Sequence, residues 1–184
     1  PRLKGLVSIS DMVKSTSSAP TGVGIAKVLG EKWFHDLARN VQPVLYAQTA
    51  QARDWVGSGE FPVTLFNYAK DATILLKRNI KVRLIYPQEG VVLLPFAPAI
   101  LKSAPHPATA RLFIDFVRSA RGAQTVMDAG SLLFFGRPGV KSPDPELLPP
   151  WENLNLIPFD WETDGSPASI KRIREVFREA GLGR

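Results

Sequence analysis

Short β-branched and apolar runs alternate with longer amphipathic segments through the first half of this chain, and this alternation most constrains its fold. Each short run has the composition of a buried strand. We expect strands at Leu6–Ile9, Pro43–Tyr46, Val63–Phe66 and Lys81–Tyr86. The segments between them carry apolar residues at helical spacing, which predicts βαβ units. The expected fold class is therefore α/β, with a mostly parallel sheet flanked by helices.

The pattern changes after the turn Pro87–Gly90. Val91–Leu101 reads as extended chain, and Ser103–Pro107 is a helix-start signal. Helices are expected from there to Val117 and over Gly122–Ala129, and again at the C-terminus. The stretch between these regions is rich in Pro, Asp and Gly, which predicts a surface course.

Composition narrows the class of protein. The chain has 184 residues, of which 45% are hydrophobic, so it can bury the core of one large domain. It has no cysteine, which excludes disulfides, thiolate zinc sites and a catalytic cysteine. Its longest clean apolar run, Val91–Ile100, is shorter than the roughly 18 to 20 residues of a membrane span. The N-terminus has neither Met nor a leader pattern, so we expect a fragment of a longer protein whose export signal is not visible.

The net charge of +6 is compatible with nucleic acid, anionic lipid or an acidic ligand. The basic residues are scattered, and the one dense run, Lys171 to Arg178, reads as a solvated helix face. A nucleic-acid site would gather basic residues with aromatics along one groove. We therefore expect no nucleic-acid partner.

Four stretches, in this order and spacing, resemble one family. They are Lys4–Asp11 with the Ser/Thr tract and Gly22 after it, Asp54–Val63, Pro87–Gly90 with Ala99–Pro107 and Ala110–Phe116, and Arg137–Val140. Together they resemble the extracellular solute-binding proteins of ABC importers, of the iron(III)-binding type. The resemblance covers nearly the whole chain.

Such proteins have two α/β lobes, joined by crossing strands, that close on a ligand. The resemblance implies a periplasmic-binding-protein-like (type II) lobe with the other lobe largely missing. Residues 1–96 would form the core of the second lobe, 97–148 would belong to the first lobe of the intact protein, and 149–184 would return to the second. The implied function is the substrate-binding component of an ABC importer, which delivers a small anionic solute to the membrane permease. The implied location is periplasmic or extracellular, with a membrane anchor if the protein is a lipoprotein.

In such lobes ligands sit at the carboxyl ends of the strands, where helix N-termini also point. Three groups of residues follow the first three expected strands: Ser15, Thr16, Ser17, Ser18 and Ala19; Gln48 and Thr49; Asn67 and Tyr68. Hydroxyls and backbone N–H groups at a helix start suit a phosphate, carboxylate or carbonate oxygen. The alternative for the first two groups is plain helix capping. Glu89, near the lobe crossing, would meet an amine on the ligand or be a solvated hinge residue.

Iron is doubtful in this sequence. Iron-binding relatives carry paired tyrosines where this chain has only Tyr68. His35 and His106 have no partner at metal-ligand spacing. We therefore expect no metal and no cofactor, and favour a phosphorylated or carboxylated metabolite. An iron(III)-binding protein with atypical ligands stays open as an alternative.

Two further function classes make different demands on the sequence. The chain has no usable Ser-His-Asp set, no Gly-x-Ser-x-Gly and no P-loop, so we expect no enzyme and no catalytic residues. The effector-binding domain of a transcription regulator shares this architecture and is the other alternative. Finally, Val91–Ala129 would lack its packing partner in a fragment, which predicts self-association as a dimer, including edge pairing at Val91–Leu94.

Overall fold

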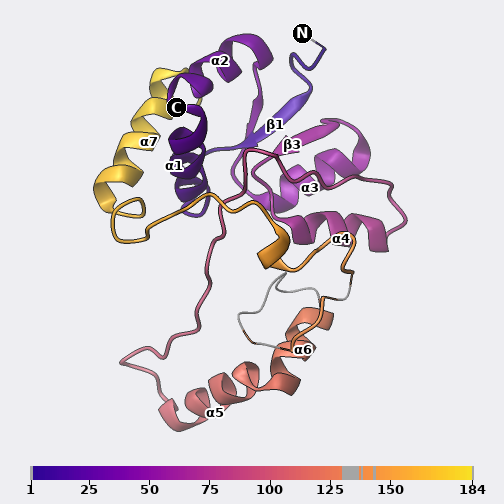
Figure 1. Ribbon diagram of the computed structural model, residues 1–184, viewed down its shortest axis with the longest axis vertical. Coiled ribbons are helices and arrows are strands. Elements are labelled where there is room, and N and C mark those ends of the chain that lie inside the picture. Colours follow the sequence, from indigo (N-terminus) through magenta and orange to yellow (C-terminus); the bar gives the residue numbers. More distant parts are fainter. Residues whose placement is uncertain (1, 130–136, 138, 143, 184) are drawn as a thin grey trace. The chain divides into compact units, whose positions relative to one another are not determined.

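The structure of the protein is a computed structural model, which describes residues 2–129, 137, 139–142 and 144–183 (Figure 1). The chain divides into two units. One comprises Pro1–Leu94 with Asn155–Arg184, and the other comprises Pro95–Leu154. The strands assigned in the described residues all lie in the first unit.

Three parallel strands form the sheet, in the order β2-β1-β3. They are β1 (Val7–Ser10), β2 (Val44–Tyr46) and β3 (Val63–Leu65). Ser10 pairs with Tyr46 on one side, and Ile9 pairs with Leu65 on the other. All four residues of β1 are buried, as expected for a central strand covered on both faces. The predicted α/β class with a parallel sheet is confirmed.

The fourth expected strand, Lys81–Tyr86, is wrong. The structure assigns no strand there, and its side chains alternate between half-buried and exposed, with Ile85 71% exposed. Alternation of apolar and polar residues indicates which side chains are covered. A strand also needs a neighbouring strand with which its backbone can form hydrogen bonds. Backbone pairing resumes only at Val91, which forms a parallel bridge with Leu156.

Helices cover both faces of the sheet (Figure 1). On one side lie α1 (Ser18–Leu29), α2 (Lys32–Val41) and α7 (Pro167–Glu179), and on the other lie α3 (Thr49–Ser58) and α4 (Ala69–Lys77). Helix α7 packs on α1 and α2, so the C-terminal segment returns to the N-terminal half of the unit. The helix predicted at the C-terminus is thereby found, with Ser166 as its N-cap.

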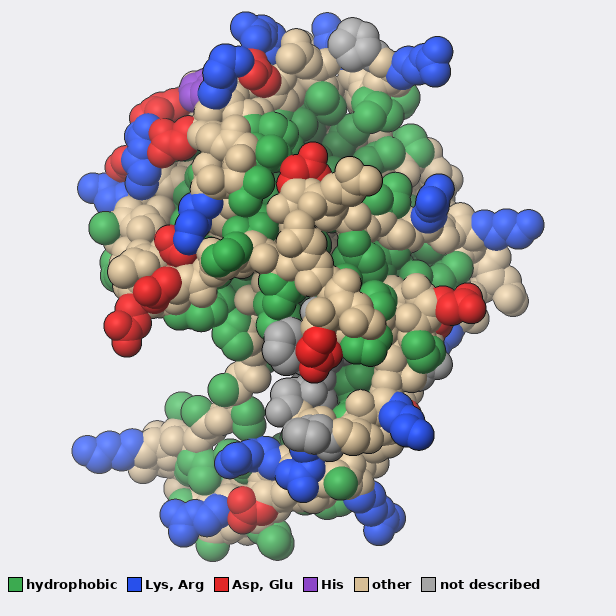
Figure 2. All heavy atoms as spheres, in the orientation of Figure 1, with side chains coloured by type: hydrophobic (Ala, Val, Ile, Leu, Met, Phe, Trp, Pro, Cys, Tyr) green, Lys and Arg blue, Asp and Glu red, His purple; other side chains and the backbone are tan. Residues whose placement is uncertain are grey.

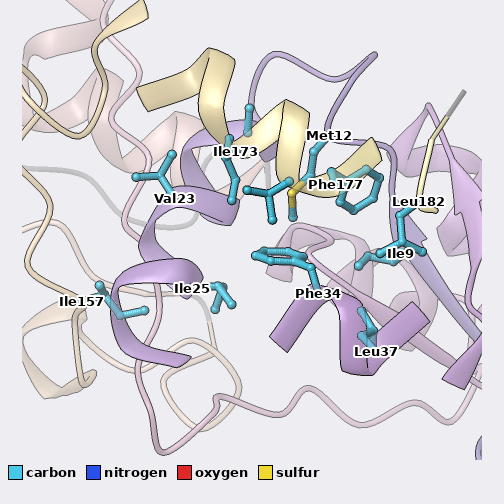
Figure 3. Packing of buried hydrophobic residues seen from close by; sticks show 12 residues of the cluster. Ile9, Met12, Val23, Ile25, Phe34, Leu37, Ile157, Ile173, Phe177 and Leu182 are labelled. Carbon is cyan, nitrogen blue, oxygen red and sulfur yellow. The ribbon is translucent and has the colours of Figure 1, made fainter. Parts of the chain in front are cut away.

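The main hydrophobic core lies between the sheet and the helices α1, α2 and α7 (Figure 3). Ile9, Met12, Phe34 and Phe177 are fully buried there. The rings of Phe34 and Phe177 meet edge to face, with centroids 6.2 Å apart. Full burial of each such side chain stabilises the fold by about 1.5 to 3 kcal/mol. Because Ile9 comes from the central strand, this core holds the sheet against α1, whose first turn follows the end of that strand.

The second unit contains the helices α5 (Pro107–Arg118) and α6 (Ala120–Asp128) and the 3-10 helix η1 (Trp151–Asn153). The two α-helices fall where the sequence predicted them. Ser119 caps α6 by accepting a hydrogen bond from the backbone N–H of Gly122 at 3.1 Å. Helix α5 has no buried residue.

The expected free edge at Val91–Leu94 needs correction. Val91 donates its backbone N–H to the carbonyl of Asn155 and accepts from the N–H of Ile157, both at 2.9 Å. Val92 packs against the main core of the first unit. The backbone of Val91 is therefore already paired within its own unit.

Candidate functional site

The carboxyl ends of the three strands meet at one edge of the sheet, because all three run in the same direction. Helices α1, α3 and α4 begin shortly after these ends, at Ser18, Thr49 and Ala69. The N-terminus of a helix presents free backbone N–H groups and the positive end of its dipole. This edge is therefore suited to a polar or anionic ligand.

The serines that follow β1 form a connected group of hydroxyls. Ser10 Oγ lies 2.5 Å from Ser18 Oγ, and Ser18 Oγ donates to Ser15 Oγ at 2.8 Å. Ser15 Oγ lies 3.3 Å from Ser17 Oγ. Ser10 and Ser18 are buried, whereas Ser15 and Ser17 are half-buried. The predicted serines are thus brought together, and Ser10 is a member that the sequence did not single out.

The structure divides the roles within this tract. Ser15 Oγ accepts a hydrogen bond from the backbone N–H of Ser18 at 3.3 Å, so helix capping falls to Ser15. Ser17 stands at the N-cap position but makes no side-chain cap bond. Thr16 is exposed, and the side chain of Ala19 is buried in the main core. Ala19 can therefore offer a ligand only its backbone N–H.

Asp11 fixes the turn between β1 and the serine tract. Its carboxylate Oδ1 accepts from the backbone N–H groups of Val13 at 2.9 Å and Lys14 at 3.3 Å. Its own N–H donates to the carbonyl of Tyr46 at 2.8 Å. Asp11 is only 2% exposed, so it stabilises the turn that carries the serines and does not face a ligand. The sequence signal was an Asp directly after a buried strand, a common turn former.

The second and third predicted groups lie side by side. Asn67 donates from Nδ2 to the carbonyl of Thr49 at 3.4 Å, and its Oδ1 accepts from the backbone N–H of Tyr68 at 2.8 Å. Both ends of the Asn67 amide are therefore engaged in holding these groups together. Gln48 is exposed at the start of α3, and Tyr68 is half-buried at the start of α4.

A lysine missed by the sequence analysis accompanies Tyr68. Lys70 is half-buried in the first turn of α4, and its Nζ lies 5.6 Å from the centroid of the Tyr68 ring. At this distance the ammonium is attracted to the aromatic face. The cation is thereby held near the strand ends, where an anionic ligand would need it.

Buried polar groups lie behind the strand ends, on the face covered by α3 and α4. Tyr46 Oη donates to the carbonyl of Leu65 at 2.7 Å, and burial raises the pKa of this phenol. Asp71 is 4% exposed and lies 3.4 Å from Arg53 Nη1, and burial raises the pKa of its carboxyl despite this neighbour. These residues were not predicted from the sequence, because each is paired across a long stretch of chain.

Glu89 lies in a different setting from the other predicted residues. It is exposed in a turn where Gly90 has a φ of 117°. The residues beside it contact the tail: the Gln88 carbonyl accepts from Asn155 Nδ2 at 2.7 Å, and Gly90 is packed against Ile157. A role for Glu89 in ligand binding stays a prediction.

The basic run on α7 makes surface ion pairs and one hydrogen bond to a backbone carbonyl. Arg172 pairs with Glu31 at 2.7 Å and with Glu179 at 3.2 Å. Arg174 donates from Nε to the carbonyl of Met12 at 3.2 Å. In Figure 2, Lys and Arg side chains stand at separate places on the visible face of the first unit. These observations fit the solvated helix face that the sequence indicated.

Neither a cluster of metal-binding side chains nor a membrane-spanning helix is found in the described residues. Within residues 2–129, 137, 139–142 and 144–183, no three His, Cys, Asp or Glu side chains come close enough together to hold a metal ion. In the same part of the chain, no helix has the length and apolar character required to cross a membrane.

The family of the chain follows from comparison with known proteins. A model of the bacterial extracellular solute-binding proteins matches residues 5–131. The chain belongs to this family. The predicted membership among extracellular solute-binding proteins is thereby confirmed, and the family is one of binding proteins, not enzymes.

Two relatives of this solute-binding protein extend the comparison. An uncharacterised protein of Haemophilus influenzae is 27% identical over an alignment of 188 residues, which covers 96% of this chain and 51% of that protein. The structure of the periplasmic binding protein AfuA from Actinobacillus pleuropneumoniae, with fructose-6-phosphate bound, matches with a TM-score of 0.77 and 23% identity. The match covers 98% of this chain and 57% of AfuA. The chain therefore has a periplasmic-binding-protein-like fold and spans about half the length of these relatives.

Proposed function

We propose that the chain is the ligand-binding lobe of the substrate-binding component of an ABC importer. In this proposal the intact protein captures a small anionic solute in an interlobe cleft, outside the cytoplasm, and delivers it to the membrane permease. The observation that carries the proposal is the set of polar groups at the strand ends, in a chain that belongs to a family of solute-binding proteins. Residues 97–148 would belong to the other lobe of the intact protein.

The preference for an anion rests on the donors at this edge. Three helices begin there, and a helix start attracts negative charge. Serine hydroxyls and the cation of Lys70 add further donors. AfuA, which shares this fold, was solved with a phosphorylated sugar, fructose-6-phosphate. We therefore propose a phosphorylated or carboxylated metabolite as the ligand class.

The chemistry of the tyrosines argues against iron(III) as the ligand. A tyrosine binds Fe(III) well as the phenolate. Tyr46 is 1% exposed, its hydroxyl is bonded to the Leu65 carbonyl, and its pKa is raised by burial. Its ionisation is therefore opposed, and Tyr68 is left as a single phenol at the strand ends. The regulator alternative is not favoured by the family match.

Titration calorimetry on the full-length protein tests the proposal. The probes are fructose 6-phosphate, inorganic phosphate and citrate, with fructose as the uncharged control and ferric citrate for the iron alternative. We expect saturable binding of at least one phosphorylated or carboxylated probe and weaker binding of fructose. Binding of ferric citrate alone, or of none of the anions, would overturn the proposal.

A further inference from the structure

The hydrogen bonds among the serine hydroxyls after β1 all run in one direction. This direction follows from counting the hydrogens that each hydroxyl can donate. A serine hydroxyl has one hydrogen to donate and two lone pairs to accept with. Ser18 Oγ gives its hydrogen to Ser15 Oγ at 2.8 Å. In the 2.5 Å contact between Ser10 and Ser18, the donor must then be Ser10.

The same counting fixes the next contact. Ser15 Oγ accepts twice, from the hydroxyl of Ser18 and from the backbone N–H of Ser18 at 3.3 Å. Both of its lone pairs are then used. In the contact with Ser17 at 3.3 Å, Ser15 must therefore be the donor.

Ser17 ends this series. It accepts from Ser15, so its own hydrogen is available to a partner outside the tract. It makes no side-chain cap bond with α1, although it stands at the N-cap position. The series also runs outward, from Ser10 and Ser18, which are 2% and 6% exposed, to the half-buried Ser17.

We infer that Ser10 is a positioning residue of the binding site, which sets this one-way chain of hydroxyls so that Ser17 presents a donor to the ligand. The ligand atom opposite Ser17 is then an acceptor, such as an oxygen of a phosphate or carboxylate group. The inference rests on the proposed function and adds to it which partner donates the hydrogen in the contact between Ser17 and the ligand. Hydrogen bonds in series polarise one another, so the outermost hydroxyl becomes a better donor than an isolated serine.

The strand that carries Ser10 also offers a matched control. Ser8 lies two residues earlier on β1, so it faces the same side of the sheet. Ser8 is also fully buried, but its Oγ has no hydrogen-bond partner among the described residues. Ser8→Ala and Ser10→Ala remove the same atom from the same strand face, and only Ser10→Ala interrupts the series.

Calorimetry on the full-length protein with fructose 6-phosphate, inorganic phosphate and citrate tests the inference. For whichever anion the wild type binds, we expect Ser10→Ala to weaken binding roughly two- to tenfold, the range of one hydrogen bond. Ser8→Ala should leave the affinity unchanged. Adding Ser10→Ala to Ser17→Ala should cause no further loss, because Ser10 acts through Ser17. A purely structural role of Ser10 would not produce this dependence on Ser17.

The outcomes separate the inference from the proposed function. Equal affinities of the Ser8→Ala and Ser10→Ala variants, or additive losses in the Ser17→Ala background, would overturn the inference alone. A wild type that binds none of the three anions would overturn the proposed function, and the inference with it. If Ser10→Ala lowers the melting temperature too far for calorimetry, Ser10→Cys keeps the shape of the side chain, replaces the hydroxyl by the weaker S–H donor, and should give a loss that also vanishes in the Ser17→Ala background.

Discussion

Tyr46 on β2 donates its hydroxyl hydrogen to the carbonyl of Leu65 on β3, at 2.7 Å, although β1 lies between these two strands. The bond therefore ties the two outer strands together across the central one. Phe66, the next residue, has a φ of 63°, in the left-handed region that bulky residues rarely occupy. Asn67 and Tyr68 follow directly, so this bond fixes the point from which the third group of the site leaves the sheet.

Removing that hydroxyl should cost stability. Tyr46→Phe keeps the buried ring and leaves the Leu65 carbonyl without this donor. We expect a loss of about 0.5 to 1.5 kcal/mol in the free energy of unfolding, the usual range for one hydrogen bond. Urea denaturation followed by circular dichroism measures it. An unchanged midpoint would show that solvent replaces the hydroxyl without loss.

Asp71 is expected to make a pH-dependent contribution to the free energy of unfolding. Burial raises the pKa of this carboxyl in the folded state above its unfolded value. Its favourable contribution is therefore greatest below the unfolded pKa, near 4, and is lost as the pH rises through the folded pKa. Asp71→Asn stays neutral throughout. The unfolding free energy of this variant, relative to wild type, should therefore be higher at pH 7 than at pH 4.

Urea denaturation at the two pH values measures this difference. Asp54→Asn is the control, because Asp54 is bonded to the same Arg53 but its side chain is 63% exposed. We expect no comparable rise with pH for the control. A wild type that gains stability over Asp71→Asn between pH 4 and pH 7 would show that Arg53 outweighs burial.

Substitutions in the serine tract should cause a partial loss of ligand affinity. Ser17→Ala with Ser18→Ala should weaken binding of an anionic ligand in the intact protein, because a hydrogen bond to a charged group contributes about 1.5 to 3 kcal/mol. In the proposed site Ser17 makes the direct contact with the ligand, and Ser18 acts within the series of hydroxyls. Backbone N–H donors remain, so binding should be reduced and not abolished. Unchanged affinity in calorimetry would mean that the tract only caps α1.

Lys70, the cation beside Tyr68, should favour binding of charged ligands over uncharged ones. Lys70→Gln removes the ammonium from the first turn of α4, and Lys77→Gln removes one from its last turn. We expect Lys70→Gln to weaken binding of fructose 6-phosphate roughly 1.5- to fivefold, as for a partly exposed ion pair, and to affect fructose less. Raising the salt concentration should narrow the gap between wild type and variant. Equal effects of the two substitutions would place Lys70 away from the ligand.

Sequence patterns were sufficient to predict the helices whose start and spacing are encoded by their own residues. Helices α5 and α7 begin with a proline, Pro107 and Pro167, and repeat apolar residues at helical spacing, so they were predicted. The segment Lys81–Tyr86 has a strand-like pattern, but whether it joins a sheet depends on a backbone partner that its own residues do not encode. The position of the three polar groups at the strand ends could be predicted because each group follows a strand; their role in binding stays a prediction.

The support beneath those groups could not be predicted in the same way. Asp11 meets Tyr46, and Arg53 meets Asp71, through contacts that exist only once the strands are side by side. Neither pair has a spacing that a sequence pattern would reveal. The direction of the serine series depends in the same way on Ser10 and Ser18, which are separated by the whole turn between β1 and α1.

The apolar face of α5 predicts that the 184-residue chain self-associates. Leu112, Phe113 and Phe116 lie on one face of this helix and are 71%, 65% and 48% exposed. Burying each of them is worth about 1.5 to 3 kcal/mol, and a two-fold dimer that packs two such faces together is the simplest closed arrangement. We expect sedimentation velocity to show a dimer whose population rises with concentration, and Phe113→Glu with Phe116→Glu to abolish it. Arg118→Glu, on the opposite side of the helix, is the matched control and should leave the dimer intact. The full-length protein should be a monomer, because the other lobe would cover the same face. A chain that stays monomeric at high concentration would show that three exposed side chains on one helix are too small a surface to hold two copies together.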